Sequence, residues 1–168
     1  MDFKELCEKR FSARAYSGEP IPTDKMSYIQ ECVRLAPSAC NKQPWLFLAV
    51  KSEEAKKKLY ACYDREWFAE APLYIVACDR KSQAWTRPSD GKHHGDVDLS
   101  IAIEHLCLAA ANVGVGTCWV CNFDVPRCKE ALHLPEDLEP VAIIPMGMPA
   151  QESAPKKRKS MEEIWQEI

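Results

Sequence analysis

The chain has 168 residues, 46% hydrophobic and 28% charged, values that are ordinary for a globular domain and that exclude a disordered or low-complexity chain. Lysine plus arginine number 22 against 25 aspartates and glutamates, so the net charge of −3 offers no overall basic field for nucleic acid or a membrane surface. No apolar run approaches the roughly 20 residues of a membrane helix, and Met1 to Ser12 lacks the apolar stretch of a secretory signal. We therefore expect a single domain over residues 1–168, located in the cytoplasm, without nucleic-acid or membrane partners.

The hydrophobic pattern predicts alternating helices and strands. In chain order we expect helices over 2–10 and 23–36, a strand over 45–50, a helix over 53–62, a strand over 72–79, a polar loop over 80–95, a long helix over 96–113, a strand over 117–121, a short helix after Asp124, a strand over 140–147, and a last helix through Ile164 and Trp165. The expected N-caps are Thr23, Ser52, Asp96 and Asp124, and Ser160 with Glu163 forms a capping box. Because the strands are nearly continuous apolar runs, we expect helices on both faces of the sheet.

Nine cysteines are spread along the chain, and several lie inside apolar runs. Free cysteine behaves as a small hydrophobic residue in a reducing compartment, so we interpret them as buried thiols. Cys118 and Cys121 form a single CxxC, which leaves a zinc or dithiol protein as an alternative, although one pair is a weak signal. His93 and His94 could also bind a metal ion, but a polar loop before the long helix explains them more simply.

The segment from Arg10 to Tyr16 alternates two arginines with a serine. In an extended chain Arg10, Ser12 and Arg14 point to one side. Two guanidinium groups and a hydroxyl suit a phosphate, because the planar fork of arginine matches phosphate oxygens. A solvated N-terminal strand explains the same pattern, so this motif alone is weak evidence for a phosphate site.

A second candidate segment, APSACNKQPW, covers residues 36–45. Small residues follow the end of a helix, and the side-chain amides of Asn41 and Gln43 come before a strand. Small residues let a flat ligand approach the backbone, and amides offer both donors and acceptors to a heterocycle. An ordinary loop between a helix and a strand is the alternative.

The two segments together resemble motifs of the nitroreductase superfamily of flavin-dependent oxidoreductases. Arg10-x-Ser12-x-Arg14-x-Tyr16 is similar to the N-terminal phosphate motif of that family, and residues 36–45 are similar to its Ala-Pro-Ser-x-x-Asn-x-Gln-Pro-Trp signature. Further similar segments follow in the same order at 71–72, 108–119, 147 and 156–164. The resemblance therefore covers nearly the whole chain, which is short for the family.

The resemblance implies an α+β fold with a mixed sheet flanked by helices, in an intertwined homodimer that exchanges C-terminal segments. It implies FMN at the subunit interface and NAD(P)H as the electron donor. The implied cofactor-binding residues are Arg10, Ser12, Arg14, Lys156 and Arg158 around the phosphate, Pro37, Ser38 and Ala39 from the partner chain, Asn41 and Gln43 in the same loop, and the backbone of Cys121 and Asn122 beside the flavin N5 and O4 edge.

The resemblance also implies an activity, in which hydride or electrons pass from NAD(P)H through flavin N5 to a nitroaromatic, a quinone or a similar small acceptor. The flavin performs this chemistry, so we expect no catalytic side chain and no metal site. The rival is a flavin-binding carrier or sensor with little turnover, because the same contacts bind FMN in both cases. Cys40 and the Cys121-Asn122 pair depart from the family's usual residues, and the departure at Cys121-Asn122 leaves the substrate preference open.

Overall fold

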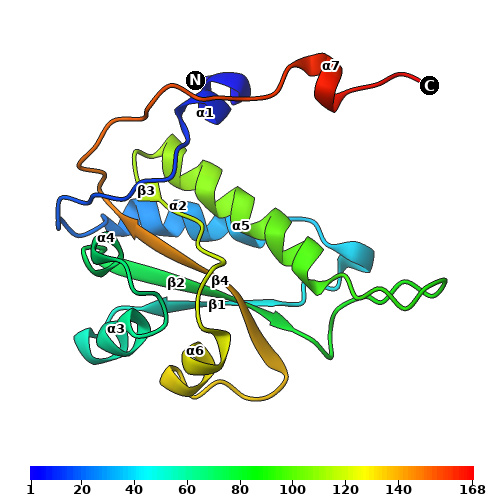
Figure 1. Cartoon of the computed structure of the whole chain (residues 1–168), viewed down its shortest axis with the longest axis horizontal. Helices are drawn as coiled ribbons and strands as arrows, with labels where there is room; N and C mark the ends of the chain where they lie inside the picture. Colours follow the sequence, from blue (N-terminus) through cyan, green and yellow to red (C-terminus); the bar gives the residue numbers. More distant parts are fainter.

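In the computed structural model, which describes all 168 residues, one sheet carries helices on both faces (Figure 1). The strands are β1 (Trp45–Val50), β2 (Leu73–Arg80), β3 (Gly116–Thr117) and β4 (Leu138–Gly147). The helices are α1 (Phe3–Lys9), α2 (Thr23–Arg34), the 3-10 turn η1 (Ala39–Asn41), α3 (Glu53–Tyr60), α4 (Glu66–Ala69), α5 (Gly95–Asn112), α6 (Val125–Ala131) and α7 (Met161–Ile164). The α+β class is confirmed, and α4 is an element that the hydrophobic pattern did not predict.

The sheet has the order β1-β2-β4-β3, and every neighbouring pair is antiparallel. This arrangement corrects the expectation of a mixed sheet, because the one parallel pairing within the chain is an isolated bridge between Ser12 and Thr117.

Strand β3 is shorter than the predicted strand over 117–121. Cys118 donates its N–H to the carbonyl of Pro145 at 3.2 Å. Proline has no N–H to return, so the regular ladder stops there. Pairing resumes as an isolated bridge between Val120 and Ile143.

Both faces of the sheet are buried, as the apolar runs predicted. Neighbouring residues of a strand point to opposite faces. On β2, Ile75 belongs to a core shared with α2 and α5, whereas Val76 belongs to a second core shared with α3, α4 and α6. Figure 1 shows these two groups of helices on opposite sides of the sheet.

Several helix ends follow the local signals of the sequence. Ser52 accepts the N–H of Ala55, and Asp124 accepts the N–H of Arg127, so both predicted caps are confirmed. The capping box of Ser160 is also present. Helix α5 is followed by Gly114 with φ +75°, the left-handed conformation typical of a residue just past a helix.

Two predicted caps are wrong. Helix α5 begins one residue earlier, with His94 as its N-cap, and Asp96 lies inside the first turn. The N–H of Gly95 reaches the ring Nδ1 of His93 at 3.3 Å, so a histidine ring serves the first turn of the helix. Thr23 is the first residue of α2 rather than its cap, because the carbonyl of Pro22 accepts the first helical hydrogen bond.

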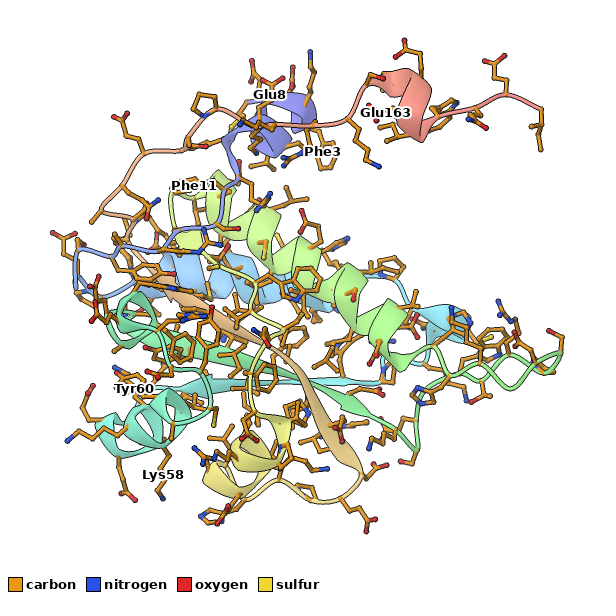
Figure 2. All side chains as sticks on the ribbon, viewed as in Figure 1. Phe3, Glu8, Phe11, Lys58, Tyr60 and Glu163 are labelled. Atoms are coloured by element: carbon orange, nitrogen blue, oxygen red, sulfur yellow. The ribbon has the colours of Figure 1, made fainter.

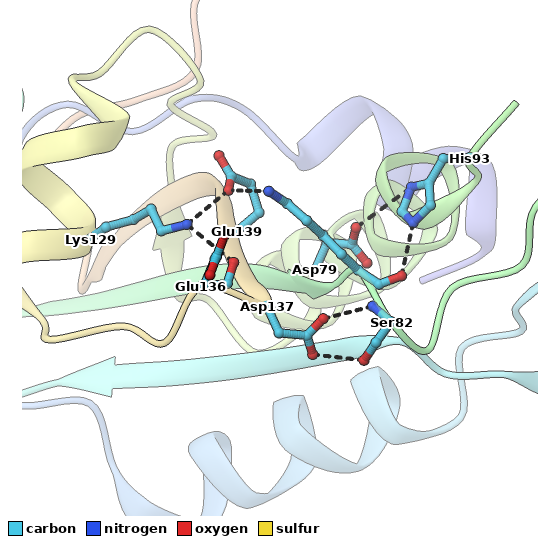
Figure 3. Close-up of polar contacts among 8 residues, drawn as sticks. Asp79, Ser82, His93, Lys129, Glu136, Asp137 and Glu139 are labelled. Carbon is cyan, nitrogen blue, oxygen red and sulfur yellow. Dashed lines mark hydrogen bonds and ion pairs between the residues drawn. The ribbon is translucent and has the colours of Figure 1, made fainter.

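Polar contacts close the end of β2 against the loop that leads to α5 (Figure 3). Nε2 of His93 lies 3.2 Å from the carbonyl of Lys81, and its Nδ1 lies 3.8 Å from the carboxylate of Asp79. Glu139 of β4 pairs with Lys81 at 2.7 Å and with Lys129 of α6 at 3.1 Å. These contacts hold the loop over 81–94 at one end of the sheet.

The chain beyond Ala150 leaves the body of the molecule. It passes α1, forms α7 far from the sheet and continues to the C-terminus (Figure 1). Figure 2 shows Glu163 on this helix, away from the sheet and its two cores. Ile164 and Trp165 are 61% and 71% exposed, so this apolar turn lacks a partner within its own chain. None of the helices is both long enough and apolar enough to cross a membrane.

Candidate cofactor-binding site

The N-terminal and C-terminal segments meet and form a groove of about 410 Å³. The cations that line it are Arg10, Arg14, Lys156, Lys157 and Arg158. Ser12 and Ser153 add hydroxyl groups, and no carboxylate lines the groove. Such a set of donors suits an anion with several oxygens, above all a phosphate.

Backbone pairing places the N-terminal side of the groove. Ala13 is fully buried and donates its N–H to the carbonyl of Thr117 in β3 at 2.9 Å. The buried hydroxyl of Tyr16 donates to the carbonyl of Ala13 at 2.8 Å. Because side chains of an extended segment alternate, Ser12 and Arg14 turn outward, as the spacing of the motif predicted.

Two glycines allow this close approach. A Cβ on Gly116 would lie 2.8 Å from the Cβ of Ala13, and a Cβ on Gly147 would lie 2.8 Å from the ring of Tyr16. The segment that carries the motif is therefore pressed against β3 and β4 at positions where no larger residue fits.

Lys156 joins the two sides of the groove. Its ammonium group donates to the backbone carbonyls of Cys7 and Arg10. Burial lowers the pKa of Lys156 below its usual value, and the charges of Arg10 and Arg158 lower this pKa further. A nearby anion would reverse the effect of the two arginines, because an opposite charge favours the charged form of lysine. The groove therefore fits the phosphate of FMN.

Glu104 of α5 balances only part of this positive charge. Its carboxylate lies 3.9 Å from Nε of Arg10, and the side chain of Glu104 is about half exposed. A partly exposed pair at this long distance contributes little, about 1 kcal/mol or less. Arg10 therefore keeps most of its capacity to bind an anion.

Arg14 is held by residues that no sequence signal indicated. Its N–H donates to Oε1 of Gln151 at 2.9 Å, and its guanidinium group lies 5.6 Å from the centroid of the Trp67 ring. The contact with Trp67 is a cation–π interaction. Lys157 is a further residue of the groove that the motif did not assign, although it stands between two that it did.

Cys121 and Asn122 lie on the segment that follows β3, and both are exposed. The backbone N–H of neither residue donates to a protein acceptor. The indole N–H of Trp119 lies 3.1 Å from Sγ of Cys121. The bridge between Ser12 and Thr117 places the start of this segment beside the groove. Two free backbone donors fit the expected role beside a flavin edge.

The CxxC pair is divided between the interior and the surface. Cys118 is buried beside the Ser12 hydroxyl, whereas Cys121 is exposed. Burial raises the pKa of the Cys118 thiol. No group of three or more histidine, cysteine, aspartate or glutamate side chains is arranged to hold a metal ion.

The structure does not bring the second candidate segment to this groove. Ala39 donates its N–H to the carboxylate of Asp98 at 2.8 Å, in the first turn of α5. Arg10 instead approaches Glu104, which lies more than one turn further along α5, about 9 Å on the helix axis. The residues of this segment with an expected binding role are Pro37, Ser38, Ala39, Asn41 and Gln43, and none of them lines the groove.

The fold thus places a basic groove, with donors that suit a phosphate, between the two terminal segments of an α+β domain. A sequence model of the Nitroreductase family matches residues 7–63 and 59–148. The chain belongs to this family. The resemblance carried by its motifs is thereby confirmed, and so is the expected class of enzyme, an oxidoreductase.

Relatives of known structure and name agree. The crystal structure of a nitroreductase family protein from Clostridium difficile 630 is 34% identical, superposes with a TM-score of 0.92, and matches 99% of this chain and 98% of that one. A Bacillus subtilis protein named FMN reductase (NAD(P)H) is 29% identical over 177 residues, covering 96% of this chain and 71% of the relative. A Thermus thermophilus protein named NADH dehydrogenase is 25% identical over 194 residues, covering 98% of this chain and 95% of the relative.

Proposed function

We propose that the chain is an FMN-dependent oxidoreductase that takes electrons from NAD(P)H and passes them to a nitroaromatic, a quinone or a similar small acceptor. The observation that carries this proposal is the basic groove, in which burial and then the charges of Arg10 and Arg158 lower the pKa of Lys156. Family membership and the name of the Bacillus subtilis relative support FMN and NAD(P)H. When bound, FMN supplies the redox chemistry.

The residues of the chain bind and orient the cofactor in this proposal. Arg10, Ser12, Arg14, Lys156 and Arg158 hold the phosphate end. The backbone N–H groups of Cys121 and Asn122 hold the edge of the flavin ring. Main-chain donors suit that task because they are already ordered, so no side-chain entropy is lost when they bind.

The proposal includes a homodimer with FMN at its interface. The loop over 37–43 lies outside the groove of its own chain, so it serves the groove of the second chain. Val97 and Ile101 leave an exposed apolar stripe on α5, and Ile164 and Trp165 are exposed on the C-terminal segment. Contiguous exposed apolar surface is typical of interfaces. A cytoplasmic location completes the proposal and is supported by the nine free thiols.

The phosphate assignment is tested by titrating the flavin-free protein with FMN and following the quenching of flavin fluorescence. Arg10→Ala should weaken FMN binding about tenfold or more, because a hydrogen bond to a charged group contributes roughly 1.5–3 kcal/mol. Lys159→Ala is the matched control, since Lys159 is a neighbouring cation that does not line the groove. Unchanged affinity in Arg10→Ala would show that the phosphate binds elsewhere.

Turnover separates the enzyme from a flavin-binding carrier. Oxidation of NAD(P)H by the FMN-loaded protein is measured with a nitroaromatic or a quinone as the acceptor, without oxygen. We expect acceptor-dependent oxidation. Tight FMN binding without oxidation of NADH or NADPH would instead identify a carrier or sensor.

A further inference from the structure

Asp98 is a buried carboxylate that the phosphate groove does not use. Its side chain sits in the first turn of α5 and is 2% exposed. Oδ1 accepts the N–H of Ala39 at 2.8 Å, and Oδ2 is buried without a protein partner. Burying a carboxylate is costly unless its contacts compensate. The contact with the loop that contains Ala39 is the one hydrogen bond that compensates for the burial of Asp98.

The loop has an unusual backbone. Cys40, Asn41 and Gln43 have φ values of 49°, 53° and 48°, in the left-handed region that side chains other than glycine disfavour. Such residues cost about 1–3 kcal/mol each and persist only when their surroundings hold them in place. Three of them in four positions mean that the loop keeps this conformation only if it is anchored.

Most of the polar contacts of the loop are local. Gln43 donates its N–H to Oγ of Ser38 at 2.8 Å, and its side-chain amide donates to Oδ1 of Asn41 at 2.9 Å. The backbone hydrogen bonds of Asn41, Lys42 and Trp45 also end within the loop. The bond from Ala39 to Asp98 is the one polar contact of residues 38–43 that reaches another element. Asp98 is therefore the anchor of residues 38–43, while the end of the loop is fixed at Pro44, whose carbonyl accepts the N–H of Arg80 at 2.7 Å.

A general effect of charge at a helix start does not explain this contact. A carboxylate in the first turn of a helix is favourable because of the helix dipole. Asp96 occupies the same turn and has the same advantage, but it is exposed and does not contact the loop. The two aspartates thus separate the effect of charge from the effect of anchoring.

We propose that Asp98 is the positioning residue for the loop that contacts FMN. Its carboxylate holds the N–H of Ala39 and thereby fixes the backbone of Pro37, Ser38 and Ala39 in the orientation in which it meets the cofactor of the second chain. This inference rests on the proposed function. Asp98 does not touch the cofactor and acts only through Ala39.

Two substitutions of Asp98 distinguish the effect of its hydrogen-bond acceptor from the effect of its negative charge. Asp98→Ala removes the acceptor and leaves the N–H of Ala39 unpaired. We expect it to weaken FMN binding about tenfold, in the range of an unpaired buried donor. Asp98→Asn keeps an oxygen that can accept this N–H, so FMN affinity should stay within about threefold of wild type. Asp96→Ala, the matched control, should leave the affinity unchanged.

Two readouts report the loop itself rather than general stability. Hydrogen exchange of the Ala39 amide, measured without flavin, should be slow in wild type and in Asp98→Asn and fast in Asp98→Ala. Visible circular dichroism at saturating FMN reports the asymmetric surroundings of the flavin, and it should change in Asp98→Ala and be restored in Asp98→Asn.

Several outcomes would overturn the proposal. One is wild-type FMN affinity in Asp98→Ala together with unchanged exchange at Ala39. Another is an equal loss of affinity in Asp98→Asn, which would make charge the important property. If Asp98→Ala does not fold, fast exchange of the Ala39 amide in wild type is decisive against the anchor. Failure of wild type to bind FMN would instead refute the proposed function, and exchange at Ala39 would still test the contact.

Discussion

Lys156 differs from the other cations of the groove because two backbone carbonyls hold its ammonium group, and burial lowers its pKa. Lysine binds phosphate only in its charged form. Because its pKa is lowered, Lys156 loses its charge at a lower pH than an ordinary lysine. FMN binding should therefore weaken several-fold as the pH rises from about 7 to about 10, within the roughly 1.5–3 kcal/mol of one charged contact.

Lys156→Arg provides the comparison, since arginine keeps its charge throughout this range. FMN titrations at constant ionic strength should give a flatter pH profile for this variant than for wild type. Identical profiles would show that Lys156 does not bind the phosphate or does not titrate in this range.

Substitutions at the exposed Cys121 can distinguish a role of its thiol from a role of its backbone N–H. If its N–H faces the flavin edge, Cys121→Ala should retain FMN and change the rate of flavin reduction by less than about tenfold, or roughly 1.4 kcal/mol of barrier. Cys121→Pro removes the N–H and should damage binding or reduction much more. Stopped-flow reduction by NAD(P)H and the flavin potential measure both effects. A large loss in the alanine variant would assign the role to the thiol.

At the level of elements, the start of α5 fits closely against the end of β2. A Cβ on Gly95 would lie 2.2 Å from Oδ2 of Asp79. This oxygen lies 3.8 Å from Nδ1 of His93 (Figure 3). Gly95 is part of the backbone of α5, and the side chain of Asp79 is buried. Gly95→Ala should therefore lower the free energy of unfolding by about 1–3 kcal/mol, the usual cost of overpacking.

A double variant provides the control for this clash. Asp79→Ala opens the space that the new methyl group needs, so Gly95→Ala should cost much less in that background. Urea denaturation of the four proteins gives the interaction between the two sites. Additive effects would mean that Gly95 is required for a reason other than contact with Asp79.

The predicted strand over 117–121 shows that a local residue pattern does not determine where a strand ends. Its residues favour a strand, and the chain does run along β4 there. Whether the ladder continues depends on Pro145, a residue of another strand that has no N–H to donate. The start of α5 shows the same limit, because the ring of His93 rather than Asp96 serves its first turn.

At the scale of the whole molecule, the exposed apolar side chains of the C-terminal segment indicate that the protein is an oligomer. We expect a homodimer at micromolar concentration, with Ile164 and Trp165 buried against the second chain. The double substitution Ile164→Asp and Trp165→Asp should weaken this dimer at least about tenfold, because burying two large apolar side chains contributes several kcal/mol. Glu167→Ala on the same segment is the control.

Sedimentation equilibrium of the FMN-loaded protein measures this effect. A wild-type monomer that keeps its FMN at micromolar concentration would contradict both the dimer and the shared cofactor site. A wild-type dimer that is unaffected by the two aspartates would show that Ile164 and Trp165 lie outside the interface.

The sequence by itself determined the features that depend on near neighbours. The caps at Ser52 and Asp124 are formed by a side chain and a backbone group three residues apart. The apolar run of β2 predicted a strand buried on both faces, because alternation along a strand is a local property. The spacing of Arg10 and Arg14 predicted a common direction for their side chains for the same reason.

Only the tertiary structure decided which of these features meet. Lys156 reaches the carbonyl of Arg10 across 146 positions of the chain, and Arg14 reaches Gln151 across 137. Asp98 binds the N–H of Ala39, which follows the C-terminal end of α2, whereas the N-terminal motif precedes α2. The segment over 36–45 therefore does not reach the basic groove of its own chain. Such contacts depend on how the burial of two cores arranges the sheet and its helices, and no short stretch of sequence contains that information.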